Sequence, residues 1–327
     1  MPRTGAPIAA LALAALMATS VVQAQEWPTR PVTMVVPFAA GGPVDVLGRI
    51  LAQYLGETIG KQVIVDNVPG GGGMTGSLRV SQAAPDGYMF VLASIGTHAL
   101  NQTLSKKPLY NAATDFAPVA LIADLSLVLV TRKDLPAADL QEFIAYAKAN
   151  EDKMQFGSAS AGSATHLGCA LLNAAIGVDV THIPYRGGAP AMQDLVAGRI
   201  DYLCIDTPIA IPLIEGGQIK ALAILTKGRS ASLPNLPSAQ EQGLANFEAA
   251  NWAAFFMPKG TPEPIVSKLA AVTATATGSP AVQKRMKDIG VDPVAADRRS
   301  PEYLAKFVDA EVAKWAGPVK ASGLATD

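Results

Sequence analysis

Apolar and polar positions alternate along the chain in a pattern that predicts short strands, each followed by a helix. Residues 32–37 form an almost unbroken apolar run, which at this length is typical of a buried strand. After a turn at residues 38–43, apolar side chains recur every three or four positions over residues 44–58, which predicts an amphipathic helix. Further strands are predicted at residues 61–66 and 88–93. Strands that alternate with helices are typical of a parallel sheet covered by helices on both faces.

The same alternation returns in the middle of the chain. Strands are predicted at residues 154–157, 180–184, 201–205 and 220–225, and helices at residues 164–175 and 189–197. Residues 261–320 have a mostly helical pattern, with helices expected at residues 262–271, 280–289 and 301–320, each of which begins near a proline, as helices often do. We therefore expect two α/β units, each a mostly parallel sheet flanked by helices.

Two long apolar stretches, residues 116–130 and 247–257, separate the two units. We interpret them as extended segments that cross from one lobe to the other, so the first lobe is discontinuous. The expected division is residues 25–126 and 247–327 for the first lobe and residues 127–246 for the second. Two lobes joined by two crossings form a hinge around a cleft, which is a common place for ligands.

Composition excludes two classes of protein. The chain has 327 residues, with 26 Lys and Arg against 27 Asp and Glu, and only 6% of it is aromatic. Proteins that bind nucleic acid normally carry a clustered basic surplus, so we expect no nucleic-acid partner. Half of the residues are hydrophobic, which argues against intrinsic disorder.

Residues 1–24 have the pattern of a cleavable secretory signal peptide. Arg3 gives a positive start, residues 8–17 form an apolar run, and Val22-Gln23-Ala24 places small residues at the cleavage positions. A run of this length is too short to span a bilayer, which takes about 20 residues. We therefore expect an exported protein, located in the periplasm.

The two cysteines, Cys169 and Cys204, leave two possibilities open. Export to an oxidising compartment permits a disulfide, but a chain of this length can fold without one. Because Cys169 falls in a predicted helix and Cys204 in a predicted strand, two buried free thiols are the simpler expectation.

Enzyme and cofactor motifs are absent or weak. Residues 71–76 match G-x-G-x-x-G, but no acidic residue ends the next strand, where a dinucleotide site would need one. The sequence has no G-x-S-x-G elbow, and His98, His166 and His182 lie on separate segments without metal-ligand spacing. We therefore expect no catalytic residues, no bound metal and no cofactor.

Two turns that lead from a strand into a helix carry small, neutral hydrogen-bond donors. They are residues 38–42, hereafter the first turn, and residues 158–165, the serine turn. Backbone N–H groups at a helix start lack intrahelical partners and lie at the positive end of the helix dipole, which favours a carboxylate. Neither turn contains Lys or Arg, so an anion there would be held by dipoles and hydroxyls. Ordinary turn and cap chemistry explains the same residues without a ligand.

Motifs spread along the whole chain resemble one family. They include Trp27-Pro28-Thr29-Arg30-Pro31, Val35-Val36-Pro37-Phe38-Ala39-Ala40-Gly41-Gly42 with Asp45 and Arg49, Pro85-Asp86-Gly87-Tyr88, Asp115-Phe116-Ala117-Pro118-Val119, Thr181-His182-Ile183-Pro184-Tyr185-Arg186-Gly187 and Pro258-Lys259-Gly260-Thr261-Pro262. In this order they resemble the extracytoplasmic solute receptors of tripartite tricarboxylate transporters, the Bug family. The similarity runs from about Glu26 to Lys320.

The resemblance implies a two-lobed α/β fold like that of type II periplasmic binding proteins, closing on a small organic carboxylate. Di- and tricarboxylates, acidic amino acids and aromatic acids are the ligand classes it implies, and the permease subunits of a tripartite transporter are the implied partners. We expect a monomer. The implied ligand-binding residues are Phe38, Ala39, Ala40, Gly41, Gly42, Ser94, Thr97, Ser158, Ser160, Ser163, Thr165 and Asp206, with Asp45 bracing the first turn.

Other interpretations stay open at this point. The closed form could dock on a membrane sensor instead of a permease. A secreted serine hydrolase would use Ser158, Ser160 or Ser163 with His166 or His182. Asp206 could receive a ligand ammonium, an acid proton or a water, or it could cap a helix.

Overall fold

The structure is a computed structural model, and it describes residues 27–321. The predicted signal peptide at residues 1–24 lies outside the described residues. The first part of the chain contains β1 (Val32–Val36), α2 (Pro43–Ile59), β2 (Val63–Asn67), the short helix η1 (Gly71–Gly73), α3 (Met74–Ser81), β3 (Met89–Ser94), η2 (Gly96–Leu100), α4 (Asn101–Leu104) and β4 (Phe116–Arg132).

The remaining elements follow in the order expected for a second α/β unit and a helical end. They are α5 (Leu140–Asn150), η3 (Glu151–Lys153), β5 (Gln155–Ser158), α6 (Ala164–Ile176), β6 (Thr181–Pro184), α7 (Gly188–Val196), β7 (Tyr202–Asp206), α8 (Thr207–Glu215), β8 (Ile219–Ile224), β9 (Ala250–Pro258), α9 (Glu263–Gly278), α10 (Pro280–Asp288), β10 (Val291–Pro293), η4 (Ala296–Arg298) and α11 (Pro301–Ala321). No helix within residues 27–321 is both long and apolar enough to cross a membrane.

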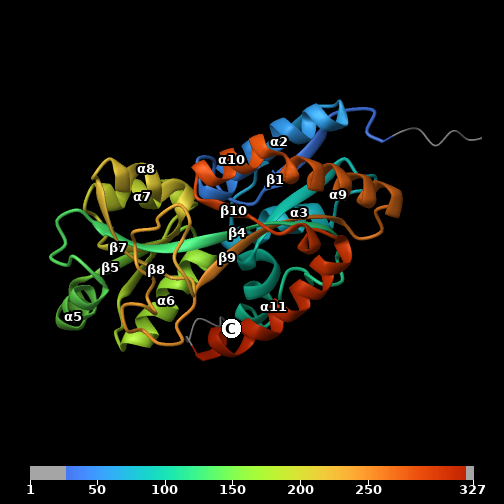
Figure 1. Ribbon diagram of the computed structural model, residues 1–327. Helices are drawn as coiled ribbons and strands as arrows, with labels where there is room; N and C mark the ends of the chain where they lie inside the picture. Colours follow the sequence, from blue (N-terminus) through green and yellow to red (C-terminus); the bar gives the residue numbers. More distant parts are fainter. Residues whose placement is uncertain (1–26, 322–327) are drawn as a thin grey trace, which may run out of the picture.

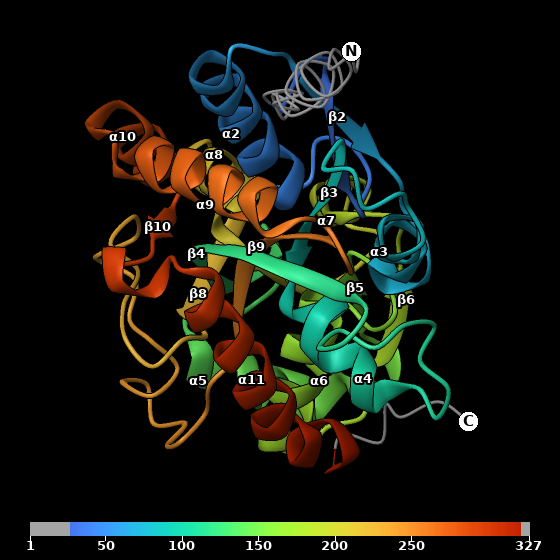
Figure 2. The same cartoon turned by 90° about the vertical axis from the view of Figure 1, so that its right-hand side faces the viewer.

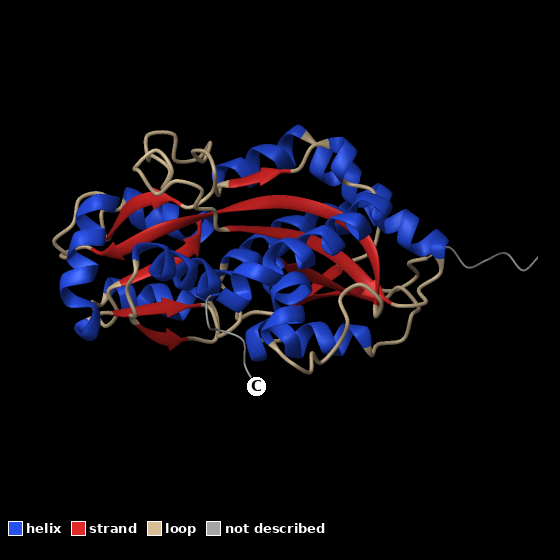
Figure 3. Cartoon of the chain, turned by 90° about the horizontal axis from the view of Figure 1, so that it is seen from below, coloured by secondary structure: helices blue, strands red, loops and turns tan. Residues whose placement is uncertain are grey.

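The ten strands of the described residues belong to one mixed sheet, in which β4 runs through both lobes (Figures 1 and 3). The order is β2-β1-β3-β9-β4-β7-β5-β6, with β10 and β8 also paired to β4. Strands β1, β2 and β3 are parallel in the first lobe, and β5, β6 and β7 are parallel in the second. The long strand β4 pairs antiparallel with β9 over its first part and with β7 and β8 over its last part.

The predicted crossings between the lobes are confirmed. The first apolar stretch becomes β4, and the second leads into β9 after the backbone amide of Ala249 donates to the carbonyl of Leu225 at 2.7 Å. Since β9 lies beside β4 in the sheet, the two passages of the chain between the lobes are neighbours. The exact division of the chain at residues 126 and 246 stays a prediction.

Each lobe buries apolar side chains on both faces of its part of the sheet. In the first lobe, α2, α9 and α10 cover one face and α4 and α11 the other, as Figure 2 shows above and below β4. In the second lobe, α5 and α6 share one apolar cluster with the sheet and α7 and α8 share another. This layering places the starts of α2, α6, α7 and α8 at the ends of the parallel strands that precede them.

Helix α9 is longer than the sequence pattern indicates, since it continues past residue 271 to Gly278. The extension contains the β-branched residues Thr273 and Thr277. Their hydroxyls donate to the carbonyls of Leu269 and Thr273 at 2.7 and 2.8 Å, which lets threonine stay in a buried helix.

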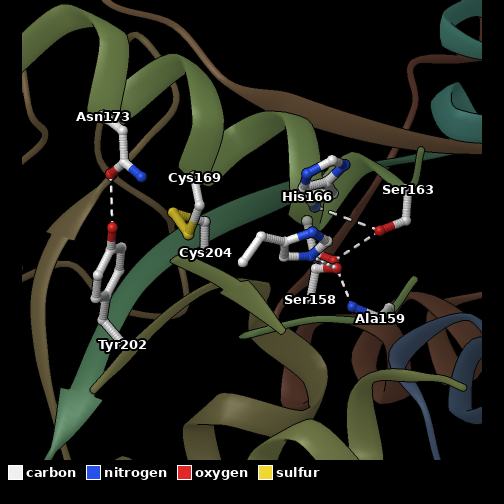
Figure 4. The surroundings of a disulfide bond; sticks show 10 residues. Ser158, Ala159, Ser163, His166, Cys169, Asn173, Tyr202 and Cys204 are labelled. Carbon is white, nitrogen blue, oxygen red and sulfur yellow. Dashed lines mark hydrogen bonds between the residues drawn. A yellow bond between two sulfur atoms is a disulfide. The ribbon is translucent and has the colours of Figure 1, made fainter. Parts of the chain in front are cut away.

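The expectation of two buried free thiols is wrong, because Cys169 and Cys204 form a disulfide (Figure 4). Both residues are fully buried, and their Cα atoms lie 5.3 Å apart. Helix α6 packs directly on β7, and this contact brings together two residues that are 35 positions apart in sequence. Residue spacing alone does not show which helix covers which strand.

Candidate functional site

The two lobes meet at a small space that we call the inner cavity. It holds about 20 Å³, room for about one water molecule. The residues that line it come from both lobes: Phe38, Pro43, Val44, Ser94, Ala159, Ser163, Ala164, Thr165, Gly188, Asp206 and Asn251. None of them is Lys, Arg or His, so the inner cavity has polar groups but no cationic side chain.

The first turn is held in place by the buried carboxylate of Asp45. This carboxylate accepts hydrogen bonds from the backbone amide of Gly41 at 2.8 Å, from Arg49 Nε at 2.9 Å and from Asn67 Nδ2 at 2.9 Å. Asn67 Nδ2 also donates to the carbonyl of Phe38 at 3.0 Å. Burial by itself would raise the pKa of Asp45, but these donors outweigh burial and keep the pKa below its ordinary value. The carboxylate therefore stays charged and fixes the turn at both ends.

The serine turn is closed by hydroxyls that bond within the turn (Figure 4). The hydroxyl of Thr165 accepts from the backbone amide of Ala159 at 2.8 Å and lies 2.9 Å from Ser163 Oγ. Ser163 Oγ donates to the carbonyl of Ser160 at 2.7 Å and caps α6 by accepting from the amide of His166 at 3.3 Å. These bonds hold Ser163 and Thr165 at the cavity wall.

Helix N-termini point at the inner cavity from both lobes. Pro43 and Val44 open α2, Ala164 opens α6 and Gly188 opens α7, and all four residues line the cavity. Each helix start adds the positive end of a helix dipole, although Pro43 of α2 has no N–H group and the amide of His166 in α6 is already bound to Ser163 Oγ. An anion in the cavity would therefore meet a positive potential made by backbone groups of both lobes.

Asp206, Asn251 and Ser94 form a polar wall of the cavity where the lobes meet. Asn251 Nδ2 donates to Asp206 Oδ1 at 2.8 Å, and its own Oδ1 accepts from the amide of Trp252 at 2.9 Å. Asp206 is 2% exposed, and burial raises its pKa to about 7, although the bond from Asn251 acts in the opposite direction. Ser94 Oγ is buried and has no hydrogen-bond partner among the described residues. This wall therefore contains one acid near its titration point and one unused hydroxyl.

A second space, the outer cleft, also lies between the lobes and shares Phe38 and Ala159 with the inner cavity. Its volume is about 400 Å³, and its lining is Phe38, Pro69, Gly70, Gly71, Gly73, Ala159, Ser160, Tyr185 and Arg186. The amide of Gly72 donates to Ser160 Oγ at 3.0 Å across this boundary. The two spaces together provide a small chamber whose surface is mostly apolar, with a few polar groups in its lining, and a larger chamber beside it.

The residues singled out from the sequence fall into three groups in the structure. Phe38, Ser94, Ser163, Thr165 and Asp206 line the inner cavity, and Ser160 lines the outer cleft. Thr97 and Ser158 line neither space, and neither do Ala39, Ala40, Gly41 and Gly42. The hydroxyl of Thr97 bonds to the backbone of Ser94 at 3.0 Å. Thr97 therefore supports a lining residue from behind.

The first turn packs against the start of α7. A methyl group at Gly187 would lie 2.8 Å from the Cβ of Ala39, which shows how close the two backbones are. The glycines that precede α7 stand in the sequence as Gly187-Gly188, so this strand-to-helix turn could have been added to the predicted site. Asn251 was also missed. In the sequence, Asn251 could have been noticed as an amide side chain within the apolar stretch at residues 247–257.

His166 and His182 lie against each other, whereas His98 packs against Phe116 and Phe256. Within residues 27–321, no group of three or more His, Cys, Asp or Glu side chains could hold a metal ion. The rings of His166 and His182 stack with their centroids 3.8 Å apart. Burial lowers the pKa of His166 to about 3 and that of His182 to about 4, so both rings are neutral at neutral pH.

Comparison with known proteins gives consistent matches over most of the chain. The model of the tripartite tricarboxylate transporter family receptor, TctC, matches residues 47–324. The periplasmic binding protein BugD is 38% identical with a TM-score of 0.89, and the match covers 92% of this chain and 100% of that structure. MatC from Rhodopseudomonas palustris, solved with bound malate, is 38% identical with a TM-score of 0.87, covering 90% and 100%.

A further R. palustris protein, solved with adipate, is 35% identical with a TM-score of 0.87, and the match covers 91% of this chain and 99% of that one. These agreements extend over both lobes and over the interlobe region described above. The chain therefore belongs to the tripartite tricarboxylate transporter receptor family, the Bug family, and is a periplasmic solute-binding protein.

Proposed function

We propose that this receptor captures a small organic carboxylate between its lobes and delivers it to the permease subunits of a tripartite transporter. The observation that carries the proposal is the inner cavity, where helix N-termini and hydroxyls from both lobes surround a space without a cationic side chain. Such a site suits a carboxylate, because backbone dipoles and hydroxyls bind its oxygens directly. The malate and adipate held by two relatives belong to the same chemical class.

Binding and lobe closure are coupled in this proposal. At about 20 Å³ the inner cavity cannot hold a dicarboxylate at the present spacing of the lobes, so the liganded form must hold the lobes further apart than they are in this structure. The acid therefore enters an open form, contacts one lobe first, and is enclosed when the second lobe closes. A ligand drives closure only through its higher affinity for the closed form, so bound acid should also stabilise the fold.

The roles of individual residues follow from their positions. We assign direct contact with the carboxylate to Phe38, Ser94, Ser163, Thr165 and Asp206 around the inner cavity, and contact with the rest of the ligand to Ser160. Asp45 and Thr97 position other residues of the site, since their hydrogen bonds hold the first turn and the backbone of Ser94, respectively. Ala39–Gly42 supply the backbone against which α7 closes.

A binding panel tests the proposal. We expect malate, adipate, citrate, aspartate or benzoate, or a close relative of one of them, to raise the melting temperature and to give saturable heat in calorimetry. The matched controls are the neutral amides succinamide and benzamide, which should do neither. If no acid shifts the melting temperature and calorimetry is also silent, carboxylate capture is rejected.

Delivery to a permease needs a separate test. Deletion of the gene should abolish uptake of the bound acid by cells, and a plasmid copy should restore it. If uptake is unchanged while the cells lose a transcriptional response to the acid, the receptor serves a membrane sensor instead.

A further inference from the structure

We propose that Asp206 binds the ligand as a neutral acid and donates a hydrogen bond to a carboxylate oxygen. This inference rests on the proposed function, since it assumes that a carboxylate occupies the inner cavity. In this proposal Asp206 recognises the anionic form of the ligand, and binding depends on the proton that Asp206 carries.

Asp206 does not act as a helix cap, although it stands where a cap would. It stands at the N-cap of α8, yet its side chain makes no capping bond to that helix. Its carboxyl group accepts a hydrogen bond from Asn251, which reaches it from β9 at 2.8 Å. Asp206 is 2% exposed and lines the inner cavity, so the carboxyl group is held at the ligand space.

A charged Asp206 would oppose the binding of a carboxylate. Two like charges in a buried site repel each other more strongly than in water, because the effective dielectric constant there is lower. No Lys, Arg or His lines the inner cavity to offset this repulsion. When a proton lies between the two carboxyl groups, the repulsion is replaced by a charge-assisted hydrogen bond. The proton on Asp206 therefore takes the place of the cationic side chain that the inner cavity lacks.

The titratable groups on the surrounding elements are engaged elsewhere. On α2, Asp45 is paired with Arg49 at 2.9 Å. On α6 and β6, His166 and His182 stack on each other, and both are neutral at neutral pH. Strand β4 places Leu127 opposite Asp206, β3 contributes Ser94, and α8 continues with Thr207, which bonds to Gly290. Asp206 is therefore the one ionisable side chain that lines the inner cavity.

Ser94 supports the same interpretation. Its hydroxyl is buried in the same wall and has no partner among the described residues. A ligand oxygen at this wall would receive one hydrogen bond from Ser94 and a second from protonated Asp206. These two hydrogen-bond donors suit a carboxylate, whose oxygens accept hydrogen bonds. They do not suit an ammonium group, which has no lone pair to accept a hydrogen bond.

The experiment is a pH series of dissociation constants for malate and adipate, measured by calorimetry from pH 6 to pH 9. Because burial raises the pKa of Asp206 to about 7, the wild type should bind about tenfold more weakly at pH 8 than at pH 6. The neutral isostere Asp206→Asn should lose this pH dependence. The control is Asp292→Asn, a half-buried acid on β10 whose pKa is also raised, and it should keep the wild-type slope.

A second measurement does not depend on a variant. Calorimetry in buffers of different ionisation enthalpy should show uptake of about one proton per bound ligand by the wild type at pH 8. Affinity that is independent of pH, or the absence of proton uptake, would overturn the proposal while leaving carboxylate capture intact. Affinity for aspartate that increases with pH would also overturn it, because it would mean that charged Asp206 binds an ammonium. Failure of every acid at every pH would reject the proposed function as well.

Discussion

The backbone amide of Gly72 donates a hydrogen bond of 3.0 Å to the hydroxyl of Ser160 and so joins the two lobes beside the ligand space. Gly72 has a φ of +68°, and a methyl group placed on it would lie 2.6 Å from the carbonyl oxygen of Ala161. The contact therefore needs glycine both for its backbone conformation and for the close approach of the opposite lobe.

Gly72→Ala should disfavour the closed form, because the added methyl group separates the two turns. We expect at least tenfold weaker binding of the identified acid and no compaction on ligand addition in small-angle scattering. Gly60→Ala is the matched control, since Gly60 has a φ of +70° but no neighbour within 4 Å of an added methyl group. Equal losses in both variants would assign the effect to backbone strain.

The Cys169–Cys204 bond should contribute to stability, since it closes a loop of 35 residues inside the second lobe. A chain-entropy estimate for a loop of this length is about 4 kcal/mol. The double variant Cys169→Ala/Cys204→Ala should therefore unfold at clearly lower urea concentration than the oxidised wild type. Thiol titration of the unreduced, denatured wild type should find no free thiol, and two free thiols would contradict the bond.

His98 should make the fold less stable in mild acid. It is fully buried beside Phe116 and Phe256, and burial lowers its pKa to about 3. Below pH 6.5 the unfolded chain takes up a proton that the folded chain does not, so stability falls as pH falls towards the folded pKa. Between pH 7 and pH 5 this costs about 2 kcal/mol. Urea unfolding of His98→Phe should show a loss smaller by that amount, and an unchanged loss would contradict this account.

Ser158 and His182 should not act as a nucleophile and its base, although Ser158 Oγ lies 2.7 Å from His182 Nε2. Ser158 is fully buried, and its hydroxyl also donates to the carbonyl of Ser160 at 3.0 Å. Since the single hydroxyl proton is used there, the histidine donates to the serine. We expect no turnover of p-nitrophenyl acetate above the buffer rate. Turnover that Ser158→Ala abolishes would instead support a hydrolase.

Ligand binding should depend only weakly on salt. The inner cavity has no lysine or arginine, and buried dipoles are screened much less than exposed charges. We expect the dissociation constant to change less than about threefold between 50 and 500 mM sodium chloride. Arg186→Gln provides the comparison, because Arg186 is the exposed cation at the outer cleft. A steep salt dependence in the wild type that this variant removes would mean that Arg186 holds the acid.

Much of the fold could be predicted from periodicity. Strand β1 and the two crossings follow from unbroken apolar runs, which reflect burial on both faces. Helix α2 follows from apolar residues at every third or fourth position, which reflect burial on one face. The end of α9 and the disulfide could not be predicted in this way. The helix continues because Thr273 and Thr277 satisfy their hydroxyls on its own carbonyls, and the disulfide depends on α6 lying over β7.

The site could be predicted where the residues that line the cavity belong to a strand-to-helix turn that the sequence pattern itself identifies. Ser163 and Thr165 are of this kind, since the serine turn brings them to the cavity by bonds within itself. Asn251 is different, because it reaches the cavity from a strand that the sequence identifies as apolar. Its pairing with Asp206 joins residues 45 positions apart and depends on the arrangement of the lobes.

Strand β4 runs without interruption from one lobe to the other, and the second passage of the chain lies next to it. Twisting one lobe against the other would break the hydrogen-bonded ladder between β4 and β9, whereas bending across this ladder would not. The molecule should therefore open and shut along a single coordinate. One distance between two probes, for example labels on α3 and α7, would then be enough to follow both the opening and the closure of the lobes.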